Sequence, residues 1–452
     1  MDPASAGRIH GGLGLAFELA EKLMTVREDV DLVLPFARLL YVNGQSTEET
    51  IEATEQLAQT VGFTAVVLPR WGELQLEVAD KNGGLAWQVA ADPAGIDMQR
   101  VAAAMHAMQD MKSSRLARAD FASAIRQIAK SPPAPTWLFT LAASVGAAAL
   151  AVIFGVAHLT AVGLIIVSAG IGAIVRRVLA ARSTNLFIQP LCAALVAGVV
   201  GGLAVRYHLS SSLRLVAVCP CMVLVPGPHL LNGALDLAYG RIHLGAARLL
   251  YGLLVVLAIV VGLLVGLAFL GVSLPVDPGG RAVPLRVDVL AAGVAVFAYS
   301  VFYSTPPKMW VWPVTVGMVA HAARWVAISL LGMGSAIGAL IACGFVGLIL
   351  TPVSRRWHMP FAAIGFASVV SLIPGVYLFR MASGLLQLAE GASTTLDLLG
   401  ATLADAITAF IIILAMGLGL VVPKMLIARI ERRQESSRAL ETKEHADLPQ
   451  HL

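Results

Sequence analysis

The sequence predicts an α-helical integral membrane protein of about ten transmembrane helices, built as two inverted five-helix repeats behind a small α/β cytoplasmic domain. Three observations support this prediction. Of the 452 residues, 58% are hydrophobic and 13% are charged, whereas a globular domain usually carries about 25% charged residues. The chain also contains ten apolar runs long enough to cross a bilayer, and its second half repeats features of the first at an offset of 148 residues.

The N-terminal segment, residues 1–134, has a different charge balance from the rest of the chain. It holds 12 Lys/Arg and 17 Asp/Glu, a net charge of −5, while the remaining residues hold 20 and 11, a net charge of +9. Glu18, Glu21 and Lys22 interrupt the first apolar residues before a signal-peptide core forms. We therefore expect residues 1–134 to form a soluble domain in the cytoplasm.

Local patterns predict both helices and strands in this domain. Ser46 and Glu49 have the spacing of a capping box, which starts a helix that ends at Gly62. Residues 81–84, Lys-Asn-Gly-Gly, predict a hairpin turn. The other helices are expected over 13–28, 30–42, 96–113 and 116–130, and the strands over 63–68, 73–79 and 85–91.

Catalytic and metal-binding motifs are missing from the N-terminal domain. It contains no GxSxG or HExxH motif and no phosphate-binding glycine loop, and His10 and His106 do not have ligand spacing. A regulatory, gating or assembly role is favoured over catalysis. The four cysteines lie in apolar stretches, where they are expected to be small core residues rather than disulfide or metal ligands. No enzyme activity, metal, cofactor or nucleic-acid partner is expected.

A proline cluster at 131–135 predicts a stiff junction to the membrane body. About 20 helical residues cross the ~30 Å of hydrocarbon. The expected spans are 136–156, 160–180, 186–205, 213–232, 246–272, 287–304, 309–330, 334–352, 361–382 and 398–421. The expected domains are a first repeat at 135–272, a linker at 273–286, a second repeat at 287–424 and a charged cytoplasmic tail at 425–452.

Basic residues near the span ends predict the orientation in the membrane. With the N-terminal domain inside, 12 Lys/Arg lie in cytoplasmic segments and 5 lie on the opposite side. Cytoplasmic loops carry the excess of Lys and Arg in membrane proteins. We therefore expect a multi-pass protein of the cell membrane with both termini in the cytoplasm.

The internal repeat is marked by rare residues rather than by leucines alone. At an offset of 148 residues, Arg176 aligns with Arg324, and Pro226-Gly227 aligns with Pro374-Gly375. Five spans per repeat would place the second repeat in the opposite orientation. Inverted repeats recur in secondary transporters, whose substrate site lies near the midplane where helices are often broken.

Each Pro-Gly pair lies inside an apolar span. Proline removes a backbone donor and glycine loosens the helical turn, so backbone groups become free to contact a solute. A simple packing kink is the alternative. The symmetric occurrence of Pro226-Gly227 and Pro374-Gly375 favours a functional break, so all four residues are candidate substrate-binding residues.

With these residues in view, the chain resembles the threonine/serine exporter family over nearly its whole length. The resemblance is carried by the segment 39–46, by Leu224-Val225-Pro226-Gly227 with Asn232, Asp236, Gly240, Gly245 and Arg248, and by 373–391. It implies proton-motive-force-driven antiport of small hydroxy amino acids, or of dicarboxylates as in two-subunit relatives. The chain departs from the family pattern at Leu235-Asp236, Gly240-Arg241 and Pro228-His229, which leaves the substrate open.

Polar groups inside the hydrocarbon are costly and are therefore functional candidates. His229 follows the first break and could carry a proton, or it could be a neutral histidine bonded to a loosened carbonyl. Asn232 and Asp236 share a helix face and could bind a substrate's amine and hydroxyl, although Asp236 could instead cap its helix or pair with Arg248. Asp405 could exchange a proton or bind the ammonium group, and its alternative is a structural partner for an arginine.

The equivalent arginines Arg176 and Arg324 are candidates for gating or for attracting carboxylates from each side of the membrane. Arg176 could equally be a positive-inside anchor, and His321 with Arg324 at i,i+3 spacing is a weaker signal. The repeat and its paired breaks predict a secondary exporter, and the resemblance implies small amino acids such as threonine and serine as its cargo, with protons and lipid as partners. A dicarboxylate exporter, a membrane-embedded enzyme or a channel are the alternatives, and homo-oligomerisation is left open.

Overall fold

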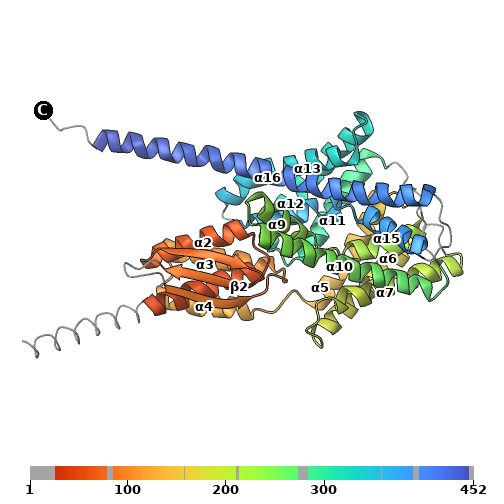
Figure 1. Ribbon diagram of the computed structural model, residues 1–452, viewed down its shortest axis with the longest axis horizontal. Helices are drawn as coiled ribbons and strands as arrows, with labels where there is room; N and C mark the ends of the chain where they lie inside the picture. Colours follow the sequence, from red (N-terminus) through yellow and green to blue (C-terminus); the bar gives the residue numbers. More distant parts are fainter. Residues whose placement is uncertain are drawn as a thin grey trace, which may run out of the picture. The chain divides into compact units, whose positions relative to one another are not determined.

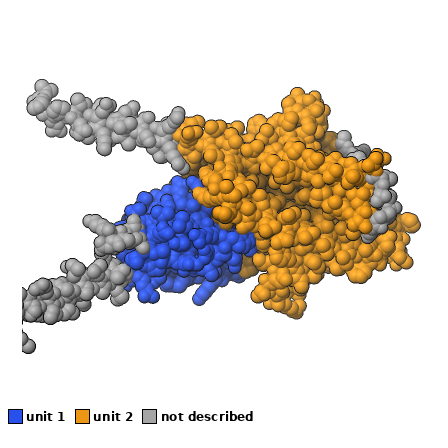
Figure 2. All heavy atoms as spheres, viewed as in Figure 1, with its two compact units in different colours: residues 1–132 blue, residues 133–452 orange. Residues whose placement is uncertain are grey.

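The computed structural model describes residues 26–78, 85–156, 158–209, 213–272, 283–357, 359–389 and 396–446. The chain divides into two compact units, Met1–Pro132 and Pro133–Leu452, which Figure 2 shows in different colours. The boundary between the units falls within the proline cluster.

The described residues of the first unit form a three-stranded antiparallel sheet in the order β1-β2-β3 and four helices (Figure 1). The strands are β1 (Ala65–Arg70), β2 (Gly72–Val78) and β3 (Leu85–Ala91). The helices are residues 26–42, α2 (Thr47–Val61), α3 (Met98–Lys112) and α4 (Arg118–Lys130). Phe36 and Phe121 pack in its core with ring centroids 5.9 Å apart.

Several details of this unit differ from the prediction. Residues 26–42 form one helix, so the predicted break near residue 29 is wrong, because no glycine or proline interrupts the chain there. Ser46 precedes α2 as expected, but its side chain makes no capping hydrogen bond. Gly62 ends α2 with φ 110°, as predicted. The start of the 13–28 helix and the 81–84 turn lie outside the described residues.

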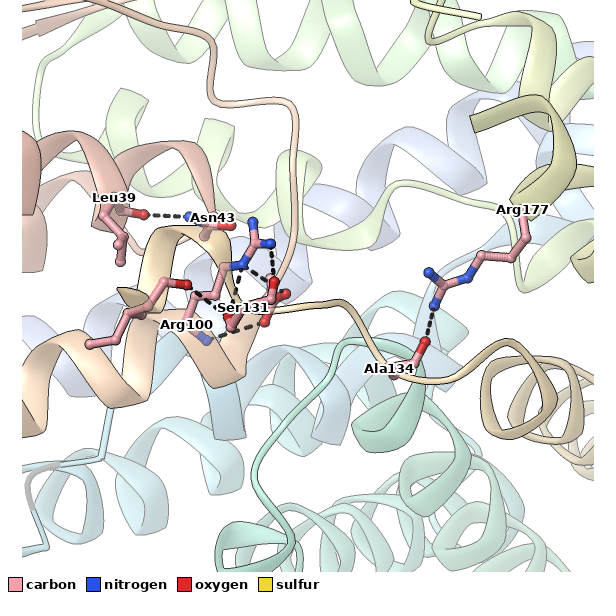
Figure 3. A network of polar contacts seen from close by, with 8 residues as sticks. Leu39, Asn43, Arg100, Ser131, Ala134 and Arg177 are labelled. Carbon is pink, nitrogen blue, oxygen red and sulfur yellow. Dashed lines mark hydrogen bonds and ion pairs between the residues drawn. The ribbon is translucent and has the colours of Figure 1, made fainter. Parts of the chain in front are cut away.

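The linker between the units is held at each end by an arginine of the adjoining unit (Figure 3). Arg100 of α3 donates to the carbonyl of Ser131, directly after α4. Arg177 donates to the carbonyl of Ala134 over 2.9 Å. The expected stiffness of the proline cluster is therefore supplemented by two side-chain anchors.

The second unit is a helical body. Its described residues form eight helices long and apolar enough to cross a membrane, or up to ten spans if each of two bent helix pairs is one span. This finding fits the predicted multi-pass membrane protein. The helices of its first half are α5 (Thr136–Ile153), α6 (Leu159–Ala180), α7 (Ile188–Arg206), α8 (Leu213–Met222), α9 (Gly227–Ala238) and α10 (Ile242–Ala268).

The second half follows the same order. Its elements are α11 (Leu285–Phe302), η1 (Pro307–Met309), α12 (Val311–Trp325), η2 (Val326–Leu330), α13 (Ser335–Arg356), α14 (Phe361–Val369), η3 (Val370–Leu372), α15 (Gly375–Ala389) and α16 (Leu396–Ala446). The bent pairs are α8 with α9, at 57°, and α14–η3 with α15, at 49°.

Some predicted span ends are wrong. The fourth span was expected to end at 232 and the ninth at 382, but α9 continues to Ala238 and α15 to Ala389. A new helix begins after each break, so the two helices of a bent pair together are longer than one straight span. The segment predicted as a charged tail begins as a helix that is continuous with the last span, since α16 runs without interruption to Ala446.

Helix neighbours are repeated in the two halves. In the first half α5 packs on α6, α6 on α7, α7 on α10, and α9 on α10. In the second half α11 packs on α12, α12 on α13, α13 on α16, and α15 on α16. Across the halves, α5 packs on α11. The 148-residue offset in sequence therefore corresponds to a repeated packing pattern.

Small residues let the third and fifth spans of each half approach closely. A Cβ on Gly262 of α10 would lie 2.1 Å from the carbonyl oxygen of Leu191 on α7. A Cβ on Gly419 of α16 would lie 2.6 Å from the carbonyl oxygen of Leu340 on α13. These backbone contacts are the close packing that glycine permits in membrane helices.

Candidate functional site

The two helix breaks have the same local backbone structure. The Gly227 amide donates to the carbonyl of Val225 over 2.8 Å, and the Gly375 amide donates to the carbonyl of Ile373 over the same distance. Proline in position 226 or 374 cannot donate a hydrogen bond and favours a restart of the helix directly after it. The Pro-Gly pairs thus produce matching turns that separate α8 from α9 and η3 from α15.

The two breaks also contact each other between the halves. A Cβ on Gly227 would lie 2.6 Å from Cδ1 of Ile373, the residue before the second Pro-Gly pair. A Cβ on Gly375 would lie 3.0 Å from Cγ of Met222, the last residue of α8. The Tyr299 hydroxyl of α11 donates to the Met222 carbonyl over 3.3 Å. The structure therefore brings together the two segments that carry the predicted Pro-Gly pairs.

Each break lies beside a small cavity that contains one of the two equivalent arginines. Cavity A is lined by Arg176, Val223, Leu224 and Phe302, among others. Cavity B is lined by Arg324, Ser371, Leu372 and Phe154, among others. These four positions correspond pairwise at the 148-residue offset, except that each phenylalanine comes from the other half. The two cavities are therefore related by the internal repeat.

The cavities are small in this conformation, with volumes of about 10 Å³ for cavity A and about 30 Å³ for cavity B. Spaces of this size are on the scale of water molecules. Either cavity must therefore widen before it can admit an amino acid.

Arg176 has a largely aromatic environment. Its guanidinium carbon lies 5.3 Å from the ring centroid of Phe302 and 5.7 Å from that of Phe139, within cation–π range. Nε and Nη1 are buried and have no hydrogen-bond partner among the described residues. A buried guanidinium with unused donors is suited to bind a carboxylate that enters cavity A.

Asp236 and Asp405 are both paired with arginines. Oδ2 of Asp236 on α9 lies 3.0 Å from Nε of Arg248 on α10, and both side chains are buried. Oδ2 of Asp405 on α16 lies 3.1 Å from Nε of Arg380 on α15. Each ion pair joins the helix after a break to the next long helix, with the positions of the acid and the base exchanged between the halves. These contacts match the alternatives to substrate binding, in which Asp236 pairs with Arg248 and Asp405 pairs with an arginine.

His229 and Asn232 are buried on α9, but they line neither cavity A nor cavity B. The His229 ring lies edge-on to Tyr251 with a centroid distance of 5.0 Å. Asn232 is 1% exposed, as is Asp236 one turn later. The predicted shared face of Asn232 and Asp236 is thus directed into the protein.

One cluster was only partly found by sequence reasoning. His321 of α12 contacts Oδ2 of Asp288 on α11 through Nδ1 at 3.1 Å, and Oγ of Ser371 through Nε2 at 2.8 Å. All three side chains are buried, and Ser371 also lines cavity B. Asp288 was missed although it is an acid inside an apolar span, which is a signal in itself. Ser371 carries no sequence signal beyond its position three residues before Pro374.

Among the described residues, no group of three or more His, Cys, Asp and Glu side chains is arranged to hold a metal ion. None of the four cysteines forms a disulfide, and three of them are buried.

The comparisons with known proteins agree with this architecture. Residues 31–270 match the family model of threonine/serine exporters, and residues 288–426 match a second model described as "Threonine/Serine exporter, ThrE". A "Probable threonine/serine exporter" of Mycobacterium tuberculosis (strain ATCC 25618 / H37Rv) is 26% identical over 399 residues, covering 82% of this chain and 74% of the relative. No solved structure matches. The chain belongs to the threonine/serine exporter family of multi-pass membrane proteins.

Proposed function

We propose that the protein is a secondary active exporter of small amino acids such as threonine and serine, driven by the proton motive force, with its substrate pathway at the paired helix breaks. The observation that carries the proposal is the pair of equivalent arginine cavities, each beside one break. Family membership supports export. The cavities support a carboxylate-bearing cargo.

The two halves have opposite orientations in the membrane in this account. Each half contains five spans when its bent pair is counted as one, and an odd number of crossings reverses the direction of the second half. The excess of basic residues on one side supports a cytoplasmic location of both termini. Arg176, near the end of α6, is then close to the cytoplasmic surface, and Arg324, near the end of α12, is close to the outer surface.

Recognition of the substrate begins at its carboxylate. Arginine binds carboxylates through paired charge-assisted hydrogen bonds, and these are stronger away from bulk water. The unused Nε and Nη1 donors of Arg176 fit this role on the cytoplasmic side. Arg324 provides the equivalent group in cavity B. The polar backbone at the breaks, with Asn232 and His229 on α9, supplies further candidate ligands for the ammonium and hydroxyl groups.

Alternating access is supported by the phenylalanine that each half contributes to the cavity of the other half. Phe302 of the second half lies over Arg176, and Phe154 of the first half lines the cavity of Arg324. Movement of one half against the other would withdraw one phenylalanine from its cavity while pressing the other into place. The small volumes of both cavities support a conformation in which neither is fully open.

The buried ion pairs keep each broken helix attached to a long partner during this movement. Arg248–Asp236 joins α9 to α10, and Arg380–Asp405 joins α15 to α16. Breaking either pair would leave a buried charge uncompensated, which is strongly unfavourable. We therefore assign the two aspartates a mainly structural role, in which they position the breaks.

Dicarboxylate export is the second candidate function, because two arginines line cavities beside the breaks. A dicarboxylate needs two cationic partners, but Arg176 and Arg324 lie in separate cavities rather than in one. A single amino-acid carboxylate requires only one arginine at a time, which fits this separation better.

Counterflow in proteoliposomes tests the proposal. Vesicles are loaded with unlabelled threonine, serine or succinate, and the same compound in radiolabelled form is added outside, with and without an imposed proton gradient. We expect threonine and serine to drive accumulation of label and succinate to drive little. Protein-dependent counterflow with succinate alone would favour the dicarboxylate function, and no counterflow under any gradient would contradict both.

A further inference from the structure

The Asp288–His321–Ser371 cluster reaches the wall of cavity B through Ser371. Histidine is the side chain whose charge ordinarily changes between pH 5 and 8. His321 is fully buried and uses both ring nitrogens, one toward Asp288 and one toward Ser371. Because Ser371 lines cavity B, a change at the imidazole is transmitted to the cavity through a single hydrogen bond.

The partners of neutral His321 determine its tautomer. An ionised carboxylate only accepts hydrogen bonds, so Nδ1 carries the proton and donates to Asp288. Nε2 is then an acceptor, and the Ser371 hydroxyl donates to it. In this state the serine proton is committed to the histidine, and the remaining lone pairs of Ser371 are available to donors in the cavity.

Protonation of His321 reverses the hydrogen bond to Ser371. Imidazolium has two N–H donors and no acceptor, so Nε2 donates to Oγ and the hydroxyl proton turns away. Cavity B then presents the positive charge of Arg324 and a hydroxyl donor, with a second positive charge behind the serine. An ammonium group loses its acceptor and meets additional positive charge, whereas a carboxylate gains a donor.

We propose that His321, held between Asp288 and Ser371, is a proton site that competes with the ammonium group of the substrate in cavity B. The inference rests on the proposed export function and names its coupling residue. Competition between a proton and the cargo for one state of the carrier is what proton-driven antiport requires, since each ligand changes the affinity of the other by the same factor.

The corresponding site of the first half cannot respond to protons. At the 148-residue offset, Asp288, His321 and Ser371 correspond to Thr140, Ala173 and Val223. Ala173 and Val223 line cavity A, but neither they nor Thr140 titrate. Thus the two cavities share an arginine, a phenylalanine and a leucine but differ in proton sensitivity. With the halves inverted, this asymmetry places proton control on the outer side only, where the cargo is released.

Few other charged groups face His321. Among the described residues, α11 contributes Asp288, while Arg286 on the same helix is exposed. On α12 itself, Arg324 lies one turn away and interacts electrostatically with Asp288. The elements η2, α14 and η3 carry no titratable side chain.

The remaining groups on neighbouring elements point elsewhere. A Cβ on Gly419 of α16 would lie 2.7 Å from Cβ of Cys343, so this α13 residue is directed toward α16. Lys308 of η1 and Arg355 and Arg356 of α13 are exposed. Tyr377 of α15 lines cavity B and interacts electrostatically with Arg324. The charged groups near the imidazole are therefore Asp288, in direct contact, and Arg324, one turn away on the same helix.

Binding to the full-length protein in nanodiscs between pH 8 and pH 5.5 tests this inference. The probes are threonine and 3-hydroxybutyrate, which lacks the ammonium group but keeps the hydroxyl and carboxylate. We expect threonine affinity to fall about tenfold or more over this range, since a competing proton changes affinity by at most about tenfold per pH unit. Affinity for 3-hydroxybutyrate should stay constant or rise.

Three variants make the test specific. His321→Gln keeps a polar side chain but cannot titrate, so threonine affinity should lose its pH dependence. Ser371→Ala keeps the histidine but removes the hydrogen bond between His321 and cavity B. The pH dependence of threonine affinity should therefore be reduced at least threefold in this variant. It also serves as a second variant if His321→Gln does not fold. His243→Gln, at an exposed histidine of α10, should behave like the unaltered protein.

The outcomes separate the two proposals. If the unaltered protein binds neither probe at any pH, the proposed export function is contradicted. If it binds threonine but His321→Gln has the same pH profile, or if both probes weaken in parallel at low pH, the proton site at His321 is overturned while export stands.

Discussion

Nε of Arg248 lies 3.0 Å from Oδ2 of Asp236, with side-chain exposures of 0% and 1%. Arg380 and Asp405 make the matching contact in the second half at 3.1 Å. The acid is on the helix after the break in the first half and on the following long helix in the second. Each break is therefore fixed to a long helix by a buried charge pair, whichever helix carries the acid.

We predict that Arg248→Met destabilises the protein by about 3–5 kcal/mol, because the buried Asp236 carboxylate loses its buried partner. Asp236→Leu combined with Arg248→Met should recover most of this loss, since an apolar pair of similar volume avoids desolvation of both charges. Thermal unfolding in detergent measures both effects. Arg241→Met is the control, because Arg241 lies 3.8 Å from Asp236 and its side chain is 25% exposed. Equal losses for Arg248→Met and Arg241→Met would contradict the structural role.

Gly262→Ala should disrupt the packing of α10 on α7, because the new Cβ would lie 2.1 Å from the Leu191 carbonyl oxygen and backbone atoms cannot rotate away. Overpacking of this kind costs about 1–3 kcal/mol. Gly163→Ala on α6 is the matched control, since no atom lies within 4 Å of its Cβ position. The midpoint of thermal unfolding should fall for the first variant and not for the second. A similar midpoint for the two variants would show that α7 and α10 are not in backbone contact.

The contact between the breaks is tested by a double-mutant cycle. Gly227→Ala should destabilise the protein by about 1–3 kcal/mol, because its Cβ would lie 2.6 Å from Cδ1 of Ile373. Ile373→Val removes that methyl and alone costs about 0.5–1.5 kcal/mol. In the double variant the steric conflict is relieved, so the combined loss should be smaller than the sum of the two single losses. Simple additivity of the unfolding free energies would mean that the breaks do not meet.

The sequence revealed the parts of the site that are marked by rare local features. Pro226-Gly227, Pro374-Gly375 and the two arginines align at the 148-residue offset, and the structure places each arginine beside a break. Proline and glycine have backbone consequences that are largely independent of tertiary context.

Tertiary partners were harder to predict. Asp288 and Ser371 approach His321 from 33 and 50 residues away in the chain, and no local periodicity reports such a contact. For Asp236 and Asp405, the sequence offered both a substrate and an arginine as partners, because a buried acid requires a counter-charge but does not identify it. The helix ends beyond the breaks were missed for a related reason, since hydropathy indicates membrane depth rather than where a restarted helix ends.

The central claim is that Arg176 and Arg324 bind the cargo carboxylate from opposite sides of the membrane. Threonine transport is measured in oriented vesicles, with the KM determined separately from the cytoplasmic and outer faces for Arg176→Gln and Arg324→Gln. A lost charge-assisted hydrogen bond is worth about 1.5–3 kcal/mol. We expect Arg176→Gln to raise the cytoplasmic KM by at least tenfold with a smaller effect outside, and Arg324→Gln to do the reverse. If both variants raise the KM on the same face, or neither raises it on either face, the account of two inverted halves with paired carboxylate cavities is contradicted.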